Sequence, residues 1–158
     1  MRTTYRVFLA VLLNLSSLAW ADNHSIKPIP SVDLTPEEVI QIVVEALKTN
    51  DSATGDQGIA TVWRFAAPGN KAVTGPLPRF TTMIKGGFSE MLNHLTTDFG
   101  PIEIDDDVAA QPVVIITPVG DEVTYLFQLR RQAAGEYEGM WMTEAVFPIA
   151  PKKPGNSI

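Results

Sequence analysis

The sequence predicts an α+β domain in which N-terminal helices pack on an antiparallel sheet of about four strands. Apolar residues recur at intervals of three and four in the first half of the chain, and they alternate with polar residues after Gly100. Helices that precede the strands, rather than alternating with them, favour helices gathered on one face of the sheet. The chain is 45% hydrophobic and contains no cysteine, so packing must hold the domain together without disulfides.

The first 21 residues predict a cleaved secretory signal, which places the protein in a bacterial periplasm or outside the cell. Arg2 and Arg6 give a positive start, and the apolar run 7–18 is too short to span a bilayer. Ala19-Trp20-Ala21 has the small residues that signal peptidase needs, so cleavage is expected after Ala21. The expected parts are the signal (1–21), an extended leader (22–34), a single α+β domain (35–149) and a flexible tail (150–158).

The first helix has a strong start signal. Thr35 can cap the helix, Pro36 suits its first turn, and Glu38 can complete a capping box, so a helix is expected to about Lys48. Its core-facing stripe is expected to be Val39, Ile40, Val43, Ala46 and Leu47.

Two further helices are expected before the sheet. Residues 57–66 predict a helix that Pro68 stops, and residues 69–78, which are rich in glycine and proline, predict a loop. Residues 78–85 predict a third helix, which ends at a pair of glycines.

The strands follow from alternation and β-branched residues. Short strand character at Ile102 and Ile104 precedes a strand over 108–117, in which Pro112 indicates a sheet edge or a bulge. Two more strands are expected over 123–130 and 137–149.

Several short motifs together resemble an uncharacterised family, the domain of unknown function 4864, over about residues 35–147. The motifs are Trp63-Arg64-Phe65-Ala66-Ala67-Pro68, Thr74-Gly75-Pro76-Leu77-Pro78-Arg79-Phe80, Met83-Ile84, Leu92-Asn93-His94 and Trp141-Met142-Thr143. The resemblance carries no known activity. The order of helices and strands also resembles the cone-shaped nuclear transport factor 2-like (SnoaL-like, cystatin-like) fold, which implies a curved sheet.

Composition excludes some function classes. A net charge of −6 is unsuited to nucleic acid or anionic lipid, so neither nucleic-acid binding nor membrane association after signal cleavage is expected. Asp105-Asp106-Asp107 lacks the spacing of a calcium loop, and two histidines without cysteine give little support for zinc. We therefore expect no metal and no cofactor.

His94 is the candidate for acid–base chemistry, because histidine titrates near neutral pH. Asp98 lies four residues further on, where a helical turn would let it orient the ring. The alternative is structural: His94 would then cap a helix end by bonding a backbone carbonyl. We also expect His94 to be dispensable for the fold.

The 69–78 segment is the candidate binding loop. It offers Asn70, Lys71 and Thr74 together with backbone amides, and Arg79 follows at the helix entrance. Such groups suit a carboxylate or a phosphate. The alternative is a structural loop in which Arg79 pairs with an acidic neighbour.

Aromatic residues are candidates for the walls of a ligand pocket between the helices and the sheet. They are Trp63, Phe80, Phe88, Tyr125, Phe127 and Trp141. The alternative for each is an ordinary place in the core.

These observations favour a non-catalytic exported domain that binds a small ligand or a protein partner through such a pocket. One alternative is an isomerase, dehydratase or hydrolase that uses His94 as its acid–base group. Another is a structural or assembly accessory, for example a homodimer formed through the open face of the sheet.

Overall fold

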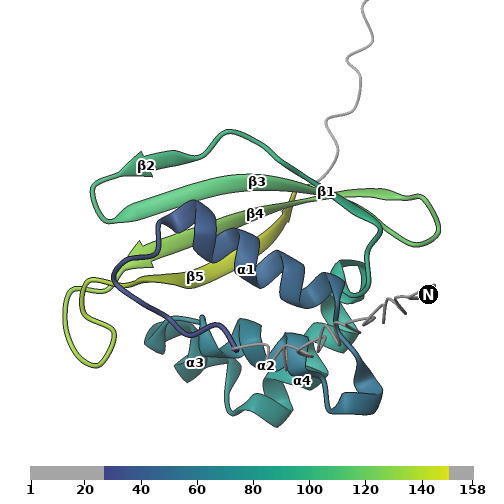
Figure 1. Ribbon diagram of the computed structural model, residues 1–158, viewed down its shortest axis with the longest axis horizontal. Coiled ribbons are helices and arrows are strands. Elements are labelled where there is room, and N and C mark those ends of the chain that lie inside the picture. The colour runs from purple at the N-terminus through teal and green to yellow at the C-terminus, as the bar shows by residue number, and fades with distance from the viewer. Residues whose placement is uncertain (1–26, 150–158) are drawn as a thin grey trace, which may run out of the picture.

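Four α-helices lie against one face of an antiparallel sheet in the computed structural model, which describes residues 27–149 (Figure 1). The predicted α+β class is confirmed. The expected signal and its cleavage site, the start of the leader (22–26) and the tail (150–158) lie outside the described residues.

Helix α1 (Pro36–Lys48) crosses the face of the sheet and begins as predicted. The backbone N–H of Glu38 donates to the Thr35 hydroxyl at 3.3 Å, and the Glu38 carboxylate accepts the Thr35 N–H at 2.8 Å. This capping box satisfies two donors that the first turn would otherwise leave free. The apolar stripe of α1 is buried and includes Val39, Ile40, Val43, Val44 and Leu47.

The other helical elements form a layer below α1 and the sheet in the view of Figure 1. They are η1 (Ser52–Thr54), α2 (Gln57–Arg64), α3 (Pro68–Thr74), α4 (Leu77–Gly87) and η2 (Ser89–Met91). The loop expected over 69–78 is wrong in its first part, because α3 occupies it. Pro68 stands in the first turn of a new helix, where its missing N–H has no helical partner to lose. The chain turns only at Gly75, whose φ of 85° suits glycine.

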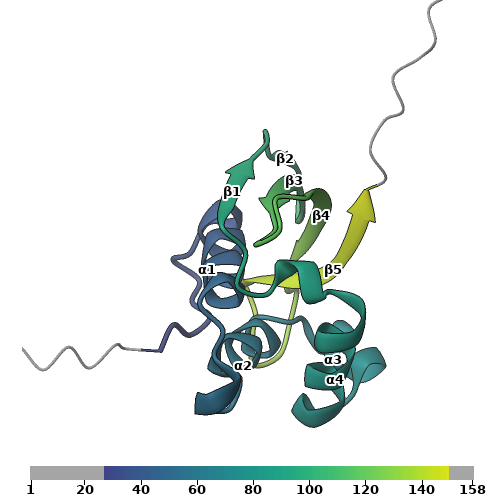
Figure 2. The same cartoon turned by 90° about the vertical axis from the view of Figure 1, so that its right-hand side faces the viewer.

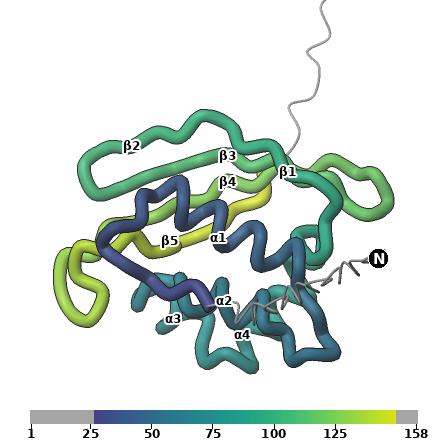
Figure 3. The backbone as a smooth tube through the Cα atoms, in the orientation of Figure 1, coloured from purple at the N-terminus to yellow at the C-terminus, as the bar shows by residue number. Residues whose placement is uncertain are grey.

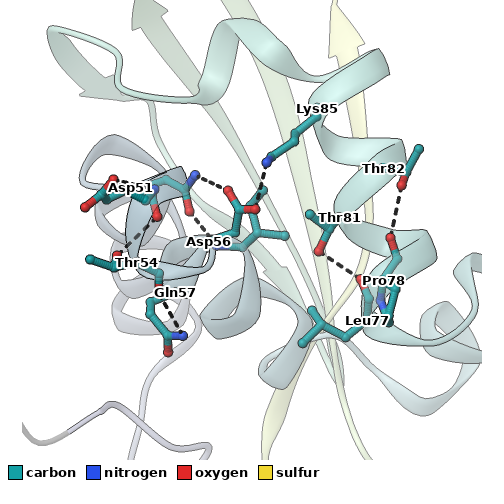
Figure 4. Close-up of polar contacts among 12 residues, drawn as sticks. Asp51, Thr54, Asp56, Gln57, Leu77, Pro78, Thr81, Thr82 and Lys85 are labelled. Atoms are coloured by element: carbon teal, nitrogen blue, oxygen red, sulfur yellow. Dashed lines mark hydrogen bonds and ion pairs between the residues drawn. The ribbon is translucent and has the colours of Figure 1, made fainter.

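The junction of α1, α2 and α4 is held by polar side chains (Figure 4). Lys85 reaches from α4 to the Asp56 carboxylate at 2.7 Å, at the start of α2. The buried Asn50 donates to the same carboxylate at 3.1 Å, and its carbonyl oxygen accepts from Ile59 N at 3.2 Å. The junction thereby fixes the approach of the three helices.

All strand pairs of the sheet are antiparallel. The strands are β1 (Thr96–Phe99), β2 (Glu103–Asp105), β3 (Val108–Ile116), β4 (Glu122–Arg131) and β5 (Trp141–Ile149). Their order is β1-β3-β4-β5, and β2 also pairs with β3, beyond the end of β1. Strand β1 was not expected. The loop between β4 and β5 extends toward the end of the molecule where α3 lies (Figure 3).

Pro112 lies in an internal strand and not at a sheet edge, but the register of the neighbouring strands shifts by one residue between β1 and β2, opposite Pro112, which fits the bulge expected as the alternative. The Pro112 carbonyl accepts from Gly100 N at 2.9 Å, and the N and C=O of one strand residue face the same side. The proline ring nitrogen therefore faces the gap between β1 and β2, where no ladder donor is needed. A Cβ on Gly100 would come within 2.7 Å of the proline ring, so glycine permits this close approach.

The core lies between the helices and the inner face of the sheet. Alternate residues of β3 and β4 point into it: Ala109, Val113, Ile115, Tyr125, Phe127 and Leu129. In the part of the chain that the structure describes, no helix covers the opposite face of the sheet (Figure 2). This one-sided packing leaves the inner face of β5 to meet α1 and α3.

Candidate functional site

A cavity of about 510 Å³ lies between the helical layer and the inner side of β4 and β5. Most of its wall is apolar and includes Leu47, Phe80, Met83, Ile84, Phe88 and Phe127. Its volume and apolar walls are typical of sites that bind small molecules, which measure roughly 300–1,000 Å³. The wall combines elements from both halves of the chain.

The α2–α3 connection fixes one end of this cavity. Thr143 N donates to Phe65 O at 2.9 Å, and Ala67 N donates to Thr143 O at 2.9 Å. The short extended segment between the two helices therefore pairs with β5 like an added strand, in parallel, at Ala66. These bonds explain why α2 ends at Arg64, before the predicted boundary at 66, and they hold α3 beside β5.

Polar side chains gather where α3 meets β5. The Asn70 amide donates to Glu144 O at 2.9 Å and to Thr143 O at 3.4 Å. The Thr74 hydroxyl donates to the backbone carbonyl of Asn70 at 2.9 Å. Asn70, Thr74, Thr143 and Glu144 all line the cavity, and we call them its polar end.

One group of the polar end is unsatisfied. Thr143 is only 3% exposed, and its hydroxyl has no hydrogen-bond partner within residues 27–149. The Glu144 carboxylate lies 3.7 Å from Nε of Arg130 and is partly exposed. Buried polar groups are normally paired, so the Thr143 hydroxyl is an exception that needs an explanation.

The structure brings together only part of the residues predicted for the site. Those that line the cavity are Asn70, Thr74, Phe80, Phe88 and Phe127, whereas Trp63, Lys71, Arg79, Tyr125, Trp141, His94 and Asp98 do not. Met83, Ile84, Thr143 and Glu144 also line the cavity, although the sequence did not mark them as site residues. For Thr143, the available signal was a hydroxyl residue at an inward-facing position of a predicted strand.

Lys71 lies outside the cavity and has partners of its own. Its Nζ lies 4.8 Å from the centroids of both the Trp63 and Tyr137 rings. It also donates to Arg64 O and to the Tyr137 hydroxyl, each at 3.4 Å. The charge expected to attract an anion instead joins α2, α3 and the loop between β4 and β5 through cation–π contacts.

Arg79 is exposed on the first turn of α4. It makes no ion pair with any acidic side chain that the structure describes, so the acidic neighbour expected for its structural alternative is not found there. Arg79 does not line the cavity, and its side chain lies against Gly75.

His94 is 3% exposed, and both of its ring nitrogens are bonded. Nδ1 lies 2.8 Å from Met91 O, and Nε2 lies 2.7 Å from the Thr97 hydroxyl. Because the carbonyl can only accept, Nδ1 carries a proton and donates to Met91 O, while Nε2 is bonded to the Thr97 hydroxyl. The bond to the carbonyl at the end of η2 matches the structural alternative. The helical turn that would bring Asp98 to the ring is wrong, since Thr96 begins β1.

Comparison with protein families decides where the chain belongs. The family described as a domain of unknown function, DUF4864, matches residues 32–155. The chain belongs to this family. The matched stretch includes every helix and strand from α1 to β5, so the whole cavity is part of the DUF4864 domain. The chain matches no curated protein and no solved structure.

Tyr125 lies on the inner face of the sheet and has a strongly shifted pKa. Among residues 27–149 of the DUF4864 domain, it is the one inner-face residue of the sheet with such a shift. Burial, and next the carboxylate of Glu90, raise the pKa of Tyr125 to about 12. Its hydroxyl donates to Glu90 at 3.4 Å, and its ring packs against Phe88 with centroids 6.0 Å apart. At neutral pH this hydroxyl therefore keeps its proton and acts as a donor.

The described part of the DUF4864 domain holds no group of three or more metal-ligating side chains. Over the same residues, no helix has the length and apolar character needed to cross a membrane. The side chains that line the cavity offer mainly apolar contact, with polar groups at its polar end.

Proposed function

We propose that this DUF4864 domain binds a small, mainly apolar molecule in the cavity between its helices and β5. The observation that carries the proposal is the cavity of about 510 Å³, whose walls are apolar side chains from the helical layer and the sheet. The main-chain bonds between 65–67 and Thr143 support a site that is formed before the ligand arrives. A preformed site lowers the entropy cost of binding.

Binding is better supported than catalysis. Acid–base catalysis needs titratable groups in contact with the substrate, usually at least two with distinct roles. Among the residues that line the cavity, Glu144 is the only one with an ionisable side chain. His94, the group expected to serve as the base, lies outside the cavity, with both nitrogens bonded.

The test is the binding of N-phenyl-1-naphthylamine, a neutral apolar dye whose fluorescence rises when it leaves water. The dye should bind saturably and with one-to-one stoichiometry. Val73 is 77% exposed and lies at the cavity wall, so Val73→Trp should obstruct the entrance and weaken binding at least tenfold. Ala72→Trp places the same ring on an exposed position of α3 outside the cavity and serves as the control.

Two results would contradict the proposal. Wild-type protein that fails to bind the dye saturably would remove the evidence for a ligand site. Equal dye affinities for Val73→Trp and Ala72→Trp, with unchanged circular dichroism for both, would place the dye elsewhere on the surface.

We also propose that the protein is exported, on the strength of the positively charged start, the apolar run and the small residues at 19 and 21. Protein recovered from the periplasm or the medium should begin at Asp22. A mature chain that still carries Met1 would remove this proposal.

The finer fold assignment is a proposal too. Helices that precede the strands and cover one face of an antiparallel sheet support the nuclear transport factor 2-like cone. Superposition of an experimental structure on members of that fold would test it, and a different strand order would contradict it.

A further inference from the structure

We propose that the free edge of β5 at Val146 binds an extended peptide segment of a partner protein, with one apolar side chain of that segment in the cavity. This inference rests on the proposed function, because the cavity is the same and the inference names the kind of molecule that fills it. It follows from the direction in which the main-chain groups of β5 point.

The hydrogen-bond pattern of the sheet fixes which residues of β5 face its free edge. In an antiparallel strand the N–H and C=O of one residue point to the same side, and the side alternates along the strand. The Pro112 carbonyl faces β1 and β2, because it accepts from Gly100 N, so the neighbouring residue Gln111 faces β4. Its partner in β4, Phe127, faces β3 in return. Val146 stands opposite Phe127 and therefore points its N–H and C=O away from β4.

The start of β5 leads to the same orientation. Thr143 bonds through both its N–H and its C=O to the 65–67 segment, so it too faces away from β4. Glu144 is an extra residue in the pairing with β4, and this bulge moves the next outward-facing position by one, to Val146. Pro148 follows two residues later, where a residue without an N–H removes no bond from the ladder.

Val146 offers a donor and an acceptor that the described residues do not use. Among them, none bonds to the Val146 N–H or C=O, whereas the Asn70 amide occupies the carbonyl of Glu144. One donor and one acceptor on the same strand residue match the backbone of an extended peptide, which can return both bonds. The same edge already binds extended backbone, because the 65–67 segment pairs with Thr143.

The cavity lies beside this open edge. Val146 is one of its lining residues and packs against the core. Residues that stand opposite each other in neighbouring strands send their side chains to the same face. A peptide residue paired with Val146 would therefore direct its side chain toward the apolar walls, which include Phe80, Met83 and Phe88. The adjacent peptide residue would lie on the outer face beside Phe147, which is 49% exposed.

The peptide acetyl-Ser-Thr-Phe-Thr-Ser-amide tests the proposal. Its central phenylalanine supplies the apolar side chain, and calorimetry together with displacement of N-phenyl-1-naphthylamine measures its binding. We expect saturable one-to-one binding that displaces the dye. The same peptide with alanine at its centre should bind at least about tenfold more weakly, because it loses the side chain that enters the cavity.

Two N-methylated peptides test the main-chain bonds on the wild-type protein. If the peptide adds antiparallel to β5, the nitrogen of its phenylalanine donates to Val146 O; if it adds in parallel, the nitrogen of the following threonine does. Methylation of one of these nitrogens should therefore weaken binding at least about tenfold, and methylation of the other should change it far less.

Substitutions at Val146 locate the effect on the protein. Val146→Pro and Val146→Ala both alter the side chain, but only proline removes the N–H, and neither removes a bond to β4. The peptide should bind Val146→Pro about tenfold more weakly than Val146→Ala, whereas the two variants should bind the dye about equally. If Val146→Pro does not fold, the N-methylated peptides still decide.

The outcomes separate this inference from the proposed function. If the dye binds but the peptide does not, or if the peptide binds without displacing the dye, the inference is overturned while the apolar site stands. Equal affinities for the unmodified and both N-methylated peptides overturn it as well. Sedimentation that shows a dimer, which Val146→Pro converts to a monomer, would assign the edge to a second copy of the chain and overturn the peptide. If neither the dye nor the peptide binds saturably, the proposed function itself fails.

Discussion

His94 shows how burial changes the meaning of a residue that sequence alone marks as chemical. A free histidine near neutral pH is a candidate base, but this ring is enclosed, and both nitrogens are bonded within its own turn. The polar groups that bond it, Met91 O and the Thr97 hydroxyl, would lose their partner if the ring were removed. These bonds favour a structural role for His94 over its being dispensable for the fold.

We predict that His94→Ala lowers the free energy of unfolding by about 1–3 kcal/mol, because it leaves partly buried polar groups unpaired. Denaturant titration measures the change. Asp98→Ala is the matched control at the residue first expected to orient the ring; Asp98 is exposed, so its loss should cost less than about 0.5 kcal/mol. Identical midpoints for His94→Ala and wild type would contradict the structural role.

At the scale of elements, the approach of α1 to α2 depends on a glycine. A Cβ on Gly58 would overlap the carbonyl oxygen of Ala46 in α1 and come within 2.9 Å of Asn50 Oδ1. These are a backbone group and an amide that is already bonded, so neither can move cheaply. Close contact of the two helices thus requires the absence of a side chain at this position.

We predict that Gly58→Ala destabilises the protein by about 1–3 kcal/mol through overpacking. Gly86→Ala is the control, because Gly86 also lies in a helix but a Cβ there meets nothing within 4 Å. That change should stabilise by about 0.5–1 kcal/mol, since alanine restricts the unfolded chain and favours helix. Thermal and denaturant unfolding of both variants would decide, and a neutral Gly58→Ala would show that α1 and α2 can separate.

Elements with strong local signals were predictable. The capping box of α1 and the alternation of β4 are encoded in neighbouring residues, and both are confirmed. Helix α3 has seven residues and no buried side chain of its own, and it depends on the main-chain pairing of 65–67 with β5. Strand β1 has four residues and forms because β3 offers it a ladder. Neither contact leaves a local pattern in the sequence.

The candidate site was predictable in part for the same reason. Phe80 and Asn70 could be named because aromatic and amide side chains stand out in a glycine- and proline-rich stretch. Thr143 could not be paired with Asn70 from sequence, because the two are 73 residues apart and meet only after α3 docks on β5. Lys71 was expected to bind an anion because its charge is visible in the sequence. Its enclosure by the rings of Trp63 and Tyr137 is a tertiary feature that no local pattern reveals.

At the scale of the whole molecule, the helical layer is joined by a charged contact that should respond to pH. Asp56 lies at the start of α2, and Lys85 of α4 holds the pKa of its carboxyl below the ordinary value of 3.8. The amide of Asn50, just after the end of α1, lowers this pKa further. In acid, the Asp56 carboxyl therefore binds fewer protons in the folded protein than in the unfolded protein. The stabilisation is present above about pH 4 and is lost as pH falls through the lowered pKa.

We predict that Asp56→Asn destabilises the protein at neutral pH and that its difference from wild type shrinks as the pH falls below about 4. Asparagine tolerates the positive φ of 56° at this position, so the comparison isolates the charge from the backbone. Denaturant titrations across acidic pH measure the difference. In a Lys85→Met background the neutral-pH effect of Asp56→Asn should be smaller, because the main partner is gone. A difference that stays constant with pH would mean that Asp56 contributes only through its hydrogen bond to Asn50, and that α4 is held to α2 by apolar contacts alone.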